Sequence, residues 1–243
     1  VANMYGYGAM TNSFNDIHLS KSIFLLGGNP AEAHPVSMLH LLHAKENGAH
    51  LIVVDPRFTR TAAHATEYVR IRAGTDVAFL WGVLWIILEN GWEDKEYIEQ
   101  RVYGFDRLRE VVAEYPPEEV ERITGVSRDQ MERVARVLVE NRPGTLIWCM
   151  GLTQSHIGSS KTRAASAFQL ALGNIGKEGG GANIFRGHDN IQGTTDLGTM
   201  CHTLPAYYGL SEDAWRHWSR VWDLDYEWVK RRFASKELME RAG

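Results

Sequence analysis

The polar, glycine-rich segment 179–193 contains the residues best suited to chemistry in this chain. Arg186, which precedes Gly187, can hold a planar carboxylate through two parallel N–H bonds. His188 can exchange a proton near neutral pH. The Asn and Gln side chains of the segment can donate and accept hydrogen bonds. Because the segment is too polar for a strand and too organised for a linker, it predicts a ligand-binding loop. A flexible surface loop with an exposed arginine is the alternative.

A second group of polar and small residues follows an apolar run that is typical of a buried strand. In a parallel α/β sheet, ligands bind at the carboxyl ends of the strands. Small residues let the backbone approach a phosphate, and a helix start there offers N–H groups and a positive dipole end. This first cluster consists of Gly27, Gly28, Asn29, Pro30, Ala31, Glu32 and Ala33.

Two more clusters follow the next two apolar runs. They are Asp55, Pro56 and Arg57, and then Gly74, Thr75 and Asp76. The Asp55 carboxylate can accept from a ribose hydroxyl, and Arg57 can pair with a phosphate. Asp76 can accept two hydrogen bonds from the N1–H and amino groups of guanine. These clusters predict a nucleotide site at the strand ends.

Each cluster also has an ordinary structural interpretation. A turn between strand and helix is common, and the GxGxxG fingerprint of dinucleotide-binding folds is absent. Asp55-Pro56 is typical of a turn, and Asp76 suits the start of a helix. The nucleotide site is favoured because three such clusters follow successive strands.

The elements that position these clusters alternate between strand and helix. Buried strands are predicted at 22–27, 50–54, 67–71 and 145–150, and helices at 35–44, 77–89, in pieces between 94 and 141, and at 159–172. Strand, helix and strand in close succession form a βαβ unit and therefore a parallel sheet. We expect a doubly wound α/β domain with flanking helices over 1–186. A helical and irregular start of an adjoining domain follows over 187–243, where Trp215, Trp218 and Trp222 predict an amphipathic helix.

Composition excludes several classes of function. The chain has 26 Lys and Arg against 30 Asp and Glu without a basic block, which argues against a nucleic-acid partner. Cys149 and Cys201 lie far apart and form no metal-binding pair. His40 and His43 share a helix face but lack a third ligand, so we expect a packed or solvated pair and no metal ligand in this chain. The chain begins with Val1 and is expected to be a fragment.

Seven runs of the sequence resemble the formate dehydrogenase branch of the dimethyl sulfoxide reductase family of molybdopterin enzymes, in the order found in that family. They are GYGAMTNSFNDI (6–17), GGNPAEAHP (27–35), DPRFTRTAAHA (55–65), RAGTDVA (72–78), MGLTQ (150–154), GNIGKEGGGAN (173–183) and RGHDNIQG (186–193). The last run points to formate dehydrogenases in particular. The stretch 207–222 resembles the respiratory, membrane-associated type.

The resemblance implies that this domain binds one of the two molybdopterin guanine dinucleotides of a whole catalytic subunit. The first cluster would line its phosphates, the second would flank ribose and phosphate, and the third would meet the guanine. The residues near the pterin would be Met150, Gly151 and Gln154. Arg186 would orient the carboxylate of formate, with His188 beside it. The whole enzyme would oxidise formate to carbon dioxide, releasing two electrons and a proton.

In the family, molybdenum or tungsten is held by both pterins and by a cysteine or selenocysteine. We expect that ligand and the iron–sulfur cluster before residue 1 and the second pterin domain after residue 243. The fragment alone is therefore predicted to be inactive. Expected partners are formate, the rest of the catalytic subunit, an iron–sulfur electron-transfer subunit and a membrane cytochrome subunit. A periplasmic, membrane-associated complex is expected, with the cytoplasm as the alternative.

Three other functions stay open at this point. One is a different molybdopterin oxidoreductase of the same family. Another is a NAD(P)-binding dehydrogenase domain, which the βαβ unit and Asp55 favour. The third is a nucleotide-binding domain without catalysis, like the central domain of thiamine diphosphate enzymes. It fits residues 27–33 but leaves RGHDNIQG unexplained.

Overall fold

The computed structural model describes residues 2–6, 8–199 and 203–233. Over these residues the chain divides into two compact units, 1–187 and 188–243. The expected domain division after residue 186 lies one residue from this boundary. The basic helix-forming stretch at the end of the sequence lies partly outside the described residues, and so does Cys201.

The first unit is built on a parallel sheet, which has five strands among the described residues. They are β1 (Ser22–Leu26), β2 (His50–Val54), β3 (Glu67–Val69), β4 (Gly144–Trp148) and β5 (Ala182–Ile184). Their order across the sheet is β3-β2-β1-β4-β5, and every pairing is parallel. All carboxyl ends therefore lie at one edge. The expected doubly wound α/β class is confirmed.

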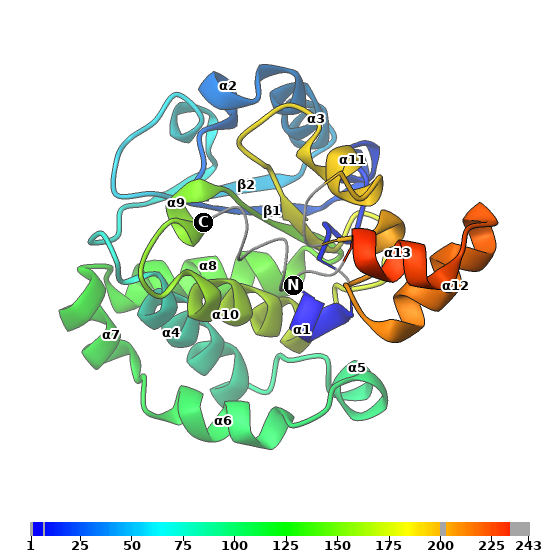
Figure 1. The fold of residues 1–243 in the computed structure, drawn as a ribbon. Helices are drawn as coiled ribbons and strands as arrows, with labels where there is room; N and C mark the ends of the chain where they lie inside the picture. The colour runs from blue at the N-terminus through cyan, green and yellow to red at the C-terminus, as the bar shows by residue number, and fades with distance from the viewer. Residues whose placement is uncertain (1, 7, 200–202, 234–243) are drawn as a thin grey trace. The chain divides into compact units, whose positions relative to one another are not determined.

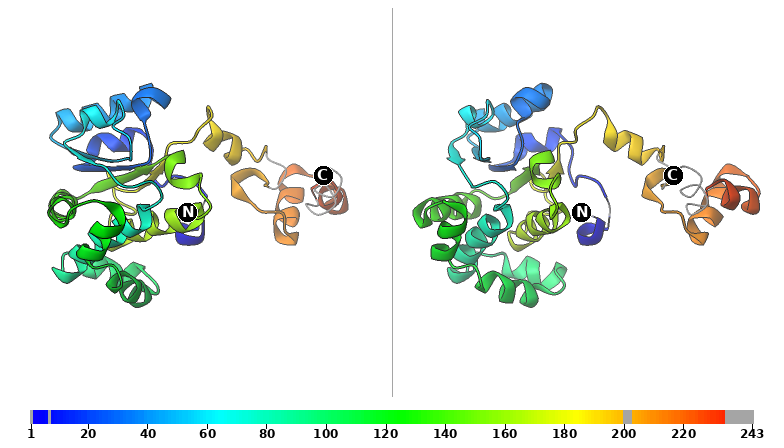
Figure 2. Two further views of the ribbon diagram at one scale, coloured as in Figure 1. Left: turned by 90° about the vertical axis from the view of Figure 1, so that its left-hand side faces the viewer. Right: turned by 60° about the vertical axis from the view of Figure 1, so that its left-hand side comes forward.

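Helices cover both faces of this sheet (Figure 1). On one face lie α2 (Pro30–Ala33) and α3 (Pro35–Glu46). The other face is covered by α4 (Asp76–Glu89), α8 (Arg128–Glu140) and α10 (Gly158–Ala171). Figure 2 shows the same layers in two further orientations. The remaining elements of this unit are α1 (Ala2–Tyr5), η1 (Asn15–Leu19), η2 (Ala62–His64), α5 (Lys95–Arg101), α6 (Phe105–Ala113), α7 (Pro117–Thr124) and α9 (Met150–Thr153).

Successive strand residues point to opposite faces, and each face has its own hydrophobic core. In β1, Phe24 packs with α4, α8 and α10, whereas Leu25 packs towards α3. Both side chains are buried, so the strands are continuous apolar runs without polar alternation. Gly82 lets α4 and α7 approach closely, because a Cβ there would lie 2.7 Å from a methyl carbon of Val120.

β5 corrects one expectation, because it lies inside the segment that we judged too polar for a strand. Its central residue, Asn183, is fully buried and pairs in register with Ile147 of β4. The Asn183 amide donates to Thr145 Oγ1 at 2.8 Å, so the buried polar group is satisfied. Hydrogen bonds of the buried amide thus allow a polar sequence to extend an apolar sheet.

The second unit is helical. It contains α11 (Ile191–Asp196), η3 (Pro205–Tyr207), α12 (Glu212–Trp222) and α13 (Tyr226–Arg232). α12 confirms the predicted amphipathic helix, and the Trp218 and Trp222 rings pack with centroids 4.9 Å apart. Ser211 begins this helix by accepting from the Ala214 N–H. Over the described residues, no helix reaches the length and apolar character needed to cross a bilayer.

Candidate functional site

The candidate site lies at the carboxyl edge of the sheet, where the loops after all five described strands meet the helices. β1 continues to β2 on one side, while its other neighbour, β4, comes from a distant part of the sequence. The point between β1 and β4 is therefore the switch point at which ligands bind in open α/β sheets. The predicted clusters and residues 150–154 follow these strands directly.

The loops after β1 and β4 approach each other so closely that only glycine fits between them. A Cβ on Gly27 would lie 2.8 Å from the Leu152 nitrogen, and one on Gly151 would lie 2.6 Å from the Gly27 oxygen. A Cβ on Gly28 would lie 2.5 Å from Cys149 Sγ. Gly27 also has φ +57°, which favours glycine. Direct packing of the two loops thus requires glycine at these positions.

The loops after β1 and β2 are locked together by polar side chains. Asn29 Oδ1 accepts from the Thr61 hydroxyl at 2.8 Å, and that hydroxyl also accepts from the Ala31 N–H at 3.0 Å. One of the helix-start donors expected to be available is therefore already engaged. Among the described residues, the N–H groups of Gly28 and Asn29 have no hydrogen-bond acceptor. Pro30, Glu32 and Ala33 form the short helix α2, in which Glu32 pairs with the exposed Arg60 at 3.6 Å.

Asp55 lies directly after β2 and forms a tight turn. Its Oδ1 accepts from the Arg57 N–H at 2.8 Å, and its carbonyl oxygen accepts from the Tyr68 hydroxyl at 2.9 Å. Burial raises the pKa of Asp55; the Arg57 N–H and charge oppose this, and the negative charge of Asp76 adds to it. Pro56 and Arg57 are exposed beside it. The two predicted carboxylates are thus close enough to interact.

Asp76 is the first residue of α4 and faces a partner that sequence reasoning missed. Lys161 Nζ, on α10, lies 2.6 Å from Asp76 Oδ2, and the side chains are only 3% and 12% exposed. The Lys161 and Asp76 side chains form an ion pair, but the angles at Nζ and Oδ2 do not fit a hydrogen bond. Thr75 occupies the N-cap position as expected, but its hydroxyl donates to the Arg72 carbonyl rather than capping the helix. Gly74, with φ +89°, forms the turn that leads the chain into this helix.

A hollow of about 470 Å³ opens beside these two clusters. Its lining includes Pro56 and Arg70 to Ala73, which come from the loops after β2 and β3, together with Thr124 and Gly125 of the α7 end. Arg72 reaches across to donate to the Ile123 carbonyl at 3.1 Å. The hollow is large enough for a purine base.

Arg186 follows β5 and is held by backbone groups from two distant segments. Its guanidinium donates to the Gly8 carbonyl at 2.7 Å, and its own carbonyl accepts from His34 Nε2. The other ring nitrogen of His34 is buried without a hydrogen-bond partner among the described residues. A Cβ on Gly187 would lie 2.5 Å from Met150 Cε, so the segment after β5 passes over that after β4.

The remaining predicted residues lie at or beyond the rim. Met150 is partly exposed at the start of α9, and Gln154 is exposed just after it. His188 is exposed and is the first residue of the second unit. Contacts link the loops after β1, β4 and β5, since Gly27 meets Gly151, Met150 meets Gly187 and His34 bonds to Arg186.

A histidine cluster and a buried thiol add further reactive side chains to the first unit. His40 Nδ1 lies 2.7 Å from His18 Nε2, and the His18 and His43 rings meet edge to face. Burial, and then the two neighbouring histidines, lower the pKa of His40. The described residues contain no group of three side chains arranged to hold a metal ion. Burial raises the pKa of Cys149 to about 12, so its thiol stays protonated at neutral pH.

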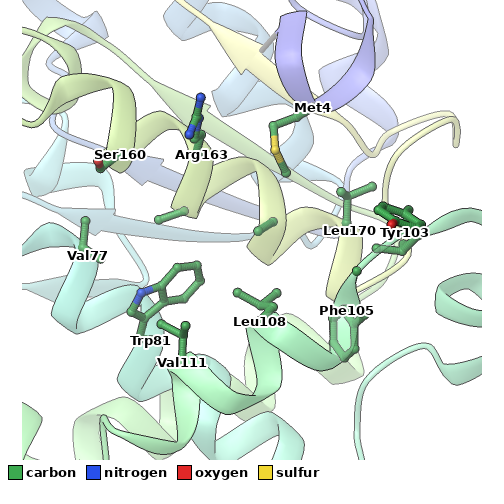
Figure 3. A pocket seen from close by; sticks show the side chains of 14 residues that line it. Met4, Val77, Trp81, Tyr103, Phe105, Leu108, Val111, Ser160, Arg163 and Leu170 are labelled. Carbon is green, nitrogen blue, oxygen red and sulfur yellow. The ribbon is translucent and has the colours of Figure 1, made fainter.

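A larger hollow of about 620 Å³ lies among α1, α4, α6 and α10 (Figure 3). Trp81 and Leu108 contribute to its apolar floor, and Arg163 extends away from them. It lies on the far side of α4 and α10 from the sheet. Its apolar lining makes it unsuitable for a charged dinucleotide.

Comparison with known proteins agrees with this architecture. The family model described as molybdopterin oxidoreductase matches residues 2–221. The alpha subunit of F420-dependent formate dehydrogenase from Methanocaldococcus jannaschii is 37% identical over 91% of this chain and 33% of that protein. Formate dehydrogenase H from Escherichia coli is 34% identical over 98% of this chain and 33% of that protein.

A solved structure shows the same fold. Acetylene hydratase from Pelobacter acetylenicus superposes with a TM-score of 0.62 and 27% identity, over 67% of this chain and 24% of that one. The chain spans about a third of the length of the curated relatives named above. The family match covers nearly all of the described residues, including every loop of the rim. This chain belongs to the molybdopterin oxidoreductase family.

Proposed function

We propose that this chain is part of the catalytic subunit of a molybdenum- or tungsten-dependent formate dehydrogenase and binds one molybdopterin guanine dinucleotide along the rim. The observation that carries the proposal is the glycine contact at the switch point between β1 and β4. Gly27, Gly28 and Gly151 leave no room for a side chain where the two loops meet. The resemblance of RGHDNIQG to formate dehydrogenases, and the two relatives with that activity in their names, support the substrate.

The donor set of the rim fits a dinucleotide. The N–H groups of Gly28 and Asn29 would meet a phosphate, with Arg57 at the exposed side. Asp55 would accept from the ribose, and Asp76 from the guanine. Met150, Gly151 and Gln154 would lie beside the pterin. The buried ring nitrogen of His34, which has no partner among the described residues, adds a polar group close to Arg186.

The bound cofactor and its metal would supply an acceptor for the two electrons that leave when formate becomes carbon dioxide and a proton. The protein's part is to position the substrate. Arg186 would grip the formate carboxylate, so that the C–H bond has one orientation. Its anchorage on the Gly8 carbonyl at 2.7 Å limits the positions of the guanidinium. His188 would stabilise this pose or accept the proton.

The remaining parts of the enzyme are proposed from the resemblance. They comprise a second dinucleotide, a cysteine or selenocysteine metal ligand and an iron–sulfur cluster outside this segment. An iron–sulfur electron-transfer subunit and a membrane cytochrome subunit would receive the electrons. We place the complex at the periplasmic face of the membrane. By this proposal, the segment without the rest of the subunit is inactive.

Acid release of bound nucleotide from the purified subunit tests the cofactor assignment. We expect guanosine monophosphate in the supernatant, identified by chromatography against standards. Recovery of an adenine nucleotide instead would contradict the proposal and favour a NAD(P)-binding domain. The control is the same protein treated at neutral pH, which should release none.

One other activity has an observation in its favour. The structural neighbour, acetylene hydratase, shows that this fold also serves a protein named for hydration rather than for formate oxidation. A different reaction within the same family is therefore the second candidate. Formate-dependent reduction of an artificial electron acceptor by the complete enzyme separates the two, because a hydratase would leave the acceptor oxidised.

A further inference from the structure

The ion pair between Asp76 and Lys161 is unusual because both of its charges are nearly buried. Their side chains are 12% and 3% exposed, and Nζ lies 2.6 Å from Oδ2. Removing two charges from water costs several kcal/mol per ion, and an apolar pair of similar volume is often as stable. Stability alone therefore does not explain why a lysine occupies this position.

The helix that carries Lys161 makes its charge still less favourable. Lys161 is the fourth residue of α10, near the positive end of the helix dipole, where a cation is disfavoured. Asp76 begins α4, where an anion is favoured. Among the described residues, Asp76 is the acidic group within 4 Å of Lys161. The charge of Lys161 is thus unfavourable at the start of α10, and its partner Asp76 belongs to a different helix, α4.

The start of α10 is fixed with respect to the crevice. A Cβ on Gly158 would overlap the Thr153 carbonyl oxygen, so α10 begins in tight contact with α9. α9 in turn follows β4, and its Gly151 touches Gly27. Lys161 therefore connects the part of the rim that follows β4 with the part that follows β3 and begins α4.

The pair also fixes the direction of the Asp76 carboxylate at this corner of the rim. Lys161 Nζ lies 2.6 Å from Oδ2, which is buried. Without Lys161 the carboxylate would be able to turn, and its other oxygen would no longer be held toward the two donors on the edge of guanine.

From this geometry we infer that Lys161 is a positioning residue that sets the base selectivity of the rim. It occupies Oδ2 of Asp76, holds the carboxylate in one orientation and leaves the other oxygen to accept from a guanine base. The inference rests on the proposed guanine nucleotide site and deepens it. Sequence patterns give no sign of it, because 85 residues separate the two partners.

Titration of cofactor-free protein with GDP and with ADP tests the inference by isothermal calorimetry. We expect wild-type protein to prefer GDP by about tenfold or more, the worth of one charge-assisted hydrogen bond. Lys161→Met should lose most of this preference, and Lys161→Arg should keep most of it. The rescue by arginine separates a role in selectivity from simple packing.

Lys177→Met is the matched control, since Lys177 forms a second Lys–Asp pair, with Asp94 at 3.4 Å, on the exposed surface. It should leave the GDP preference unchanged. If Lys161→Met does not fold, as judged by circular dichroism, Lys161→Gln takes its place and should also lose preference.

The outcomes separate two kinds of failure. A wild-type protein that binds GDP no better than ADP would contradict the proposed guanine site, and this inference with it. A wild-type preference that survives unchanged in a folded Lys161→Met or Lys161→Gln protein would overturn this inference alone. Loss in both uncharged variants, with retention in Lys161→Arg, supports it.

Discussion

At the scale of single residues, Arg186 shows how distant segments combine at one side chain. The guanidinium donates to the Gly8 carbonyl, and the Arg186 carbonyl accepts from His34. The two contacts fix both ends of the residue. A binding arginine that is pre-positioned in this way loses little entropy when it grips a carboxylate.

Arg186→Lys tests this role. Lysine keeps the positive charge but cannot form two parallel bonds to a carboxylate. In the complete enzyme we expect formate oxidation to fall by about 100-fold or more, because misplacement of the substrate by an ångström has an effect of that size. Release of guanosine monophosphate should be unchanged. A variant that keeps wild-type turnover would show that another group orients formate.

Gly28→Ala tests the bare backbone of the crevice. The new Cβ would lie 2.5 Å from Cys149 Sγ, so the loops must move apart. We expect a loss of about 1–3 kcal/mol in unfolding free energy, typical of overpacking, and reduced nucleotide content. Urea denaturation and acid release measure the two effects. Gly209→Ala, where a Cβ meets open space, should change neither.

Asp55→Asn should stabilise the cofactor-free protein, and the effect should depend on pH. Burial raises the pKa of Asp55 above its ordinary value of 3.8, so the folded chain binds this proton more tightly than the unfolded chain. Stability contributed by protonated Asp55 is present below pH 3.8 and is lost as pH rises through the raised pKa. Asparagine keeps the turn and removes this loss.

Thermal unfolding at pH 3.5 and pH 7 measures the Asp55→Asn effect. The gain in melting temperature should appear at pH 7 and vanish at pH 3.5. The nucleotide content of the variant purified at neutral pH should fall, because the proposed ribose acceptor is weakened. A gain confined to the acidic condition would show that the sign of the pKa shift is wrong.

The residues that spacing predicted are those that directly follow strands. Asp55 and Asp76 were identified because they follow apolar runs visible in the sequence, whereas Arg186 was identified from the polar, glycine-rich segment around it. Lys161 and Thr61 were not, because each acts through a partner brought near only by the sheet order. Contacts of this kind leave no periodic signal in the chain.

At the scale of elements, sequence reasoning found strands that are buried by their own composition. β1 and β2 match their predicted ranges to within one residue. β5 was missed because its burial comes from pairing with β4, and Asn183 is satisfied by Thr145 rather than by water. A polar residue in a strand is recognisable only when its partner is known.

The start of α8 shows half of a capping box. Ser127 accepts from the Gln130 N–H at 3.3 Å, as a capping box requires. The Gln130 side chain, however, donates to the Tyr68 carbonyl and to Glu67 instead of reaching back to Ser127. Ser127 therefore caps the start of α8, while Gln130 connects this helix to β3.

Ser127→Ala should lower the unfolding free energy by about 1 kcal/mol, the usual effect of losing an N-cap. Urea denaturation measures it. Nucleotide content should not change, since this helix end contributes no group to the rim. Ser159→Ala, on an exposed residue of α10 that caps nothing, is the comparison. Equal stability of the two variants would contradict the capping role.

At the scale of the whole first unit, stability should follow position in the sheet. β1 is paired on both sides and fully buried, whereas β3 and β5 are short and lie at the edges. We expect amide hydrogens of β1 to exchange with solvent at least about tenfold more slowly than those of β3. Hydrogen–deuterium exchange by mass spectrometry measures this, and equal rates would show that the sheet opens as one body.

The position of β1 between β2 and β4 also sets the order of events while the protein is being made. A ribosome that has translated only as far as residue 143 has produced one wall of the crevice and not the other, because β4 begins at Gly144. Gly8 emerges long before Arg186, the side chain it will hold. If the cofactor binds as proposed, its insertion has to wait until nearly the whole first unit has been synthesised.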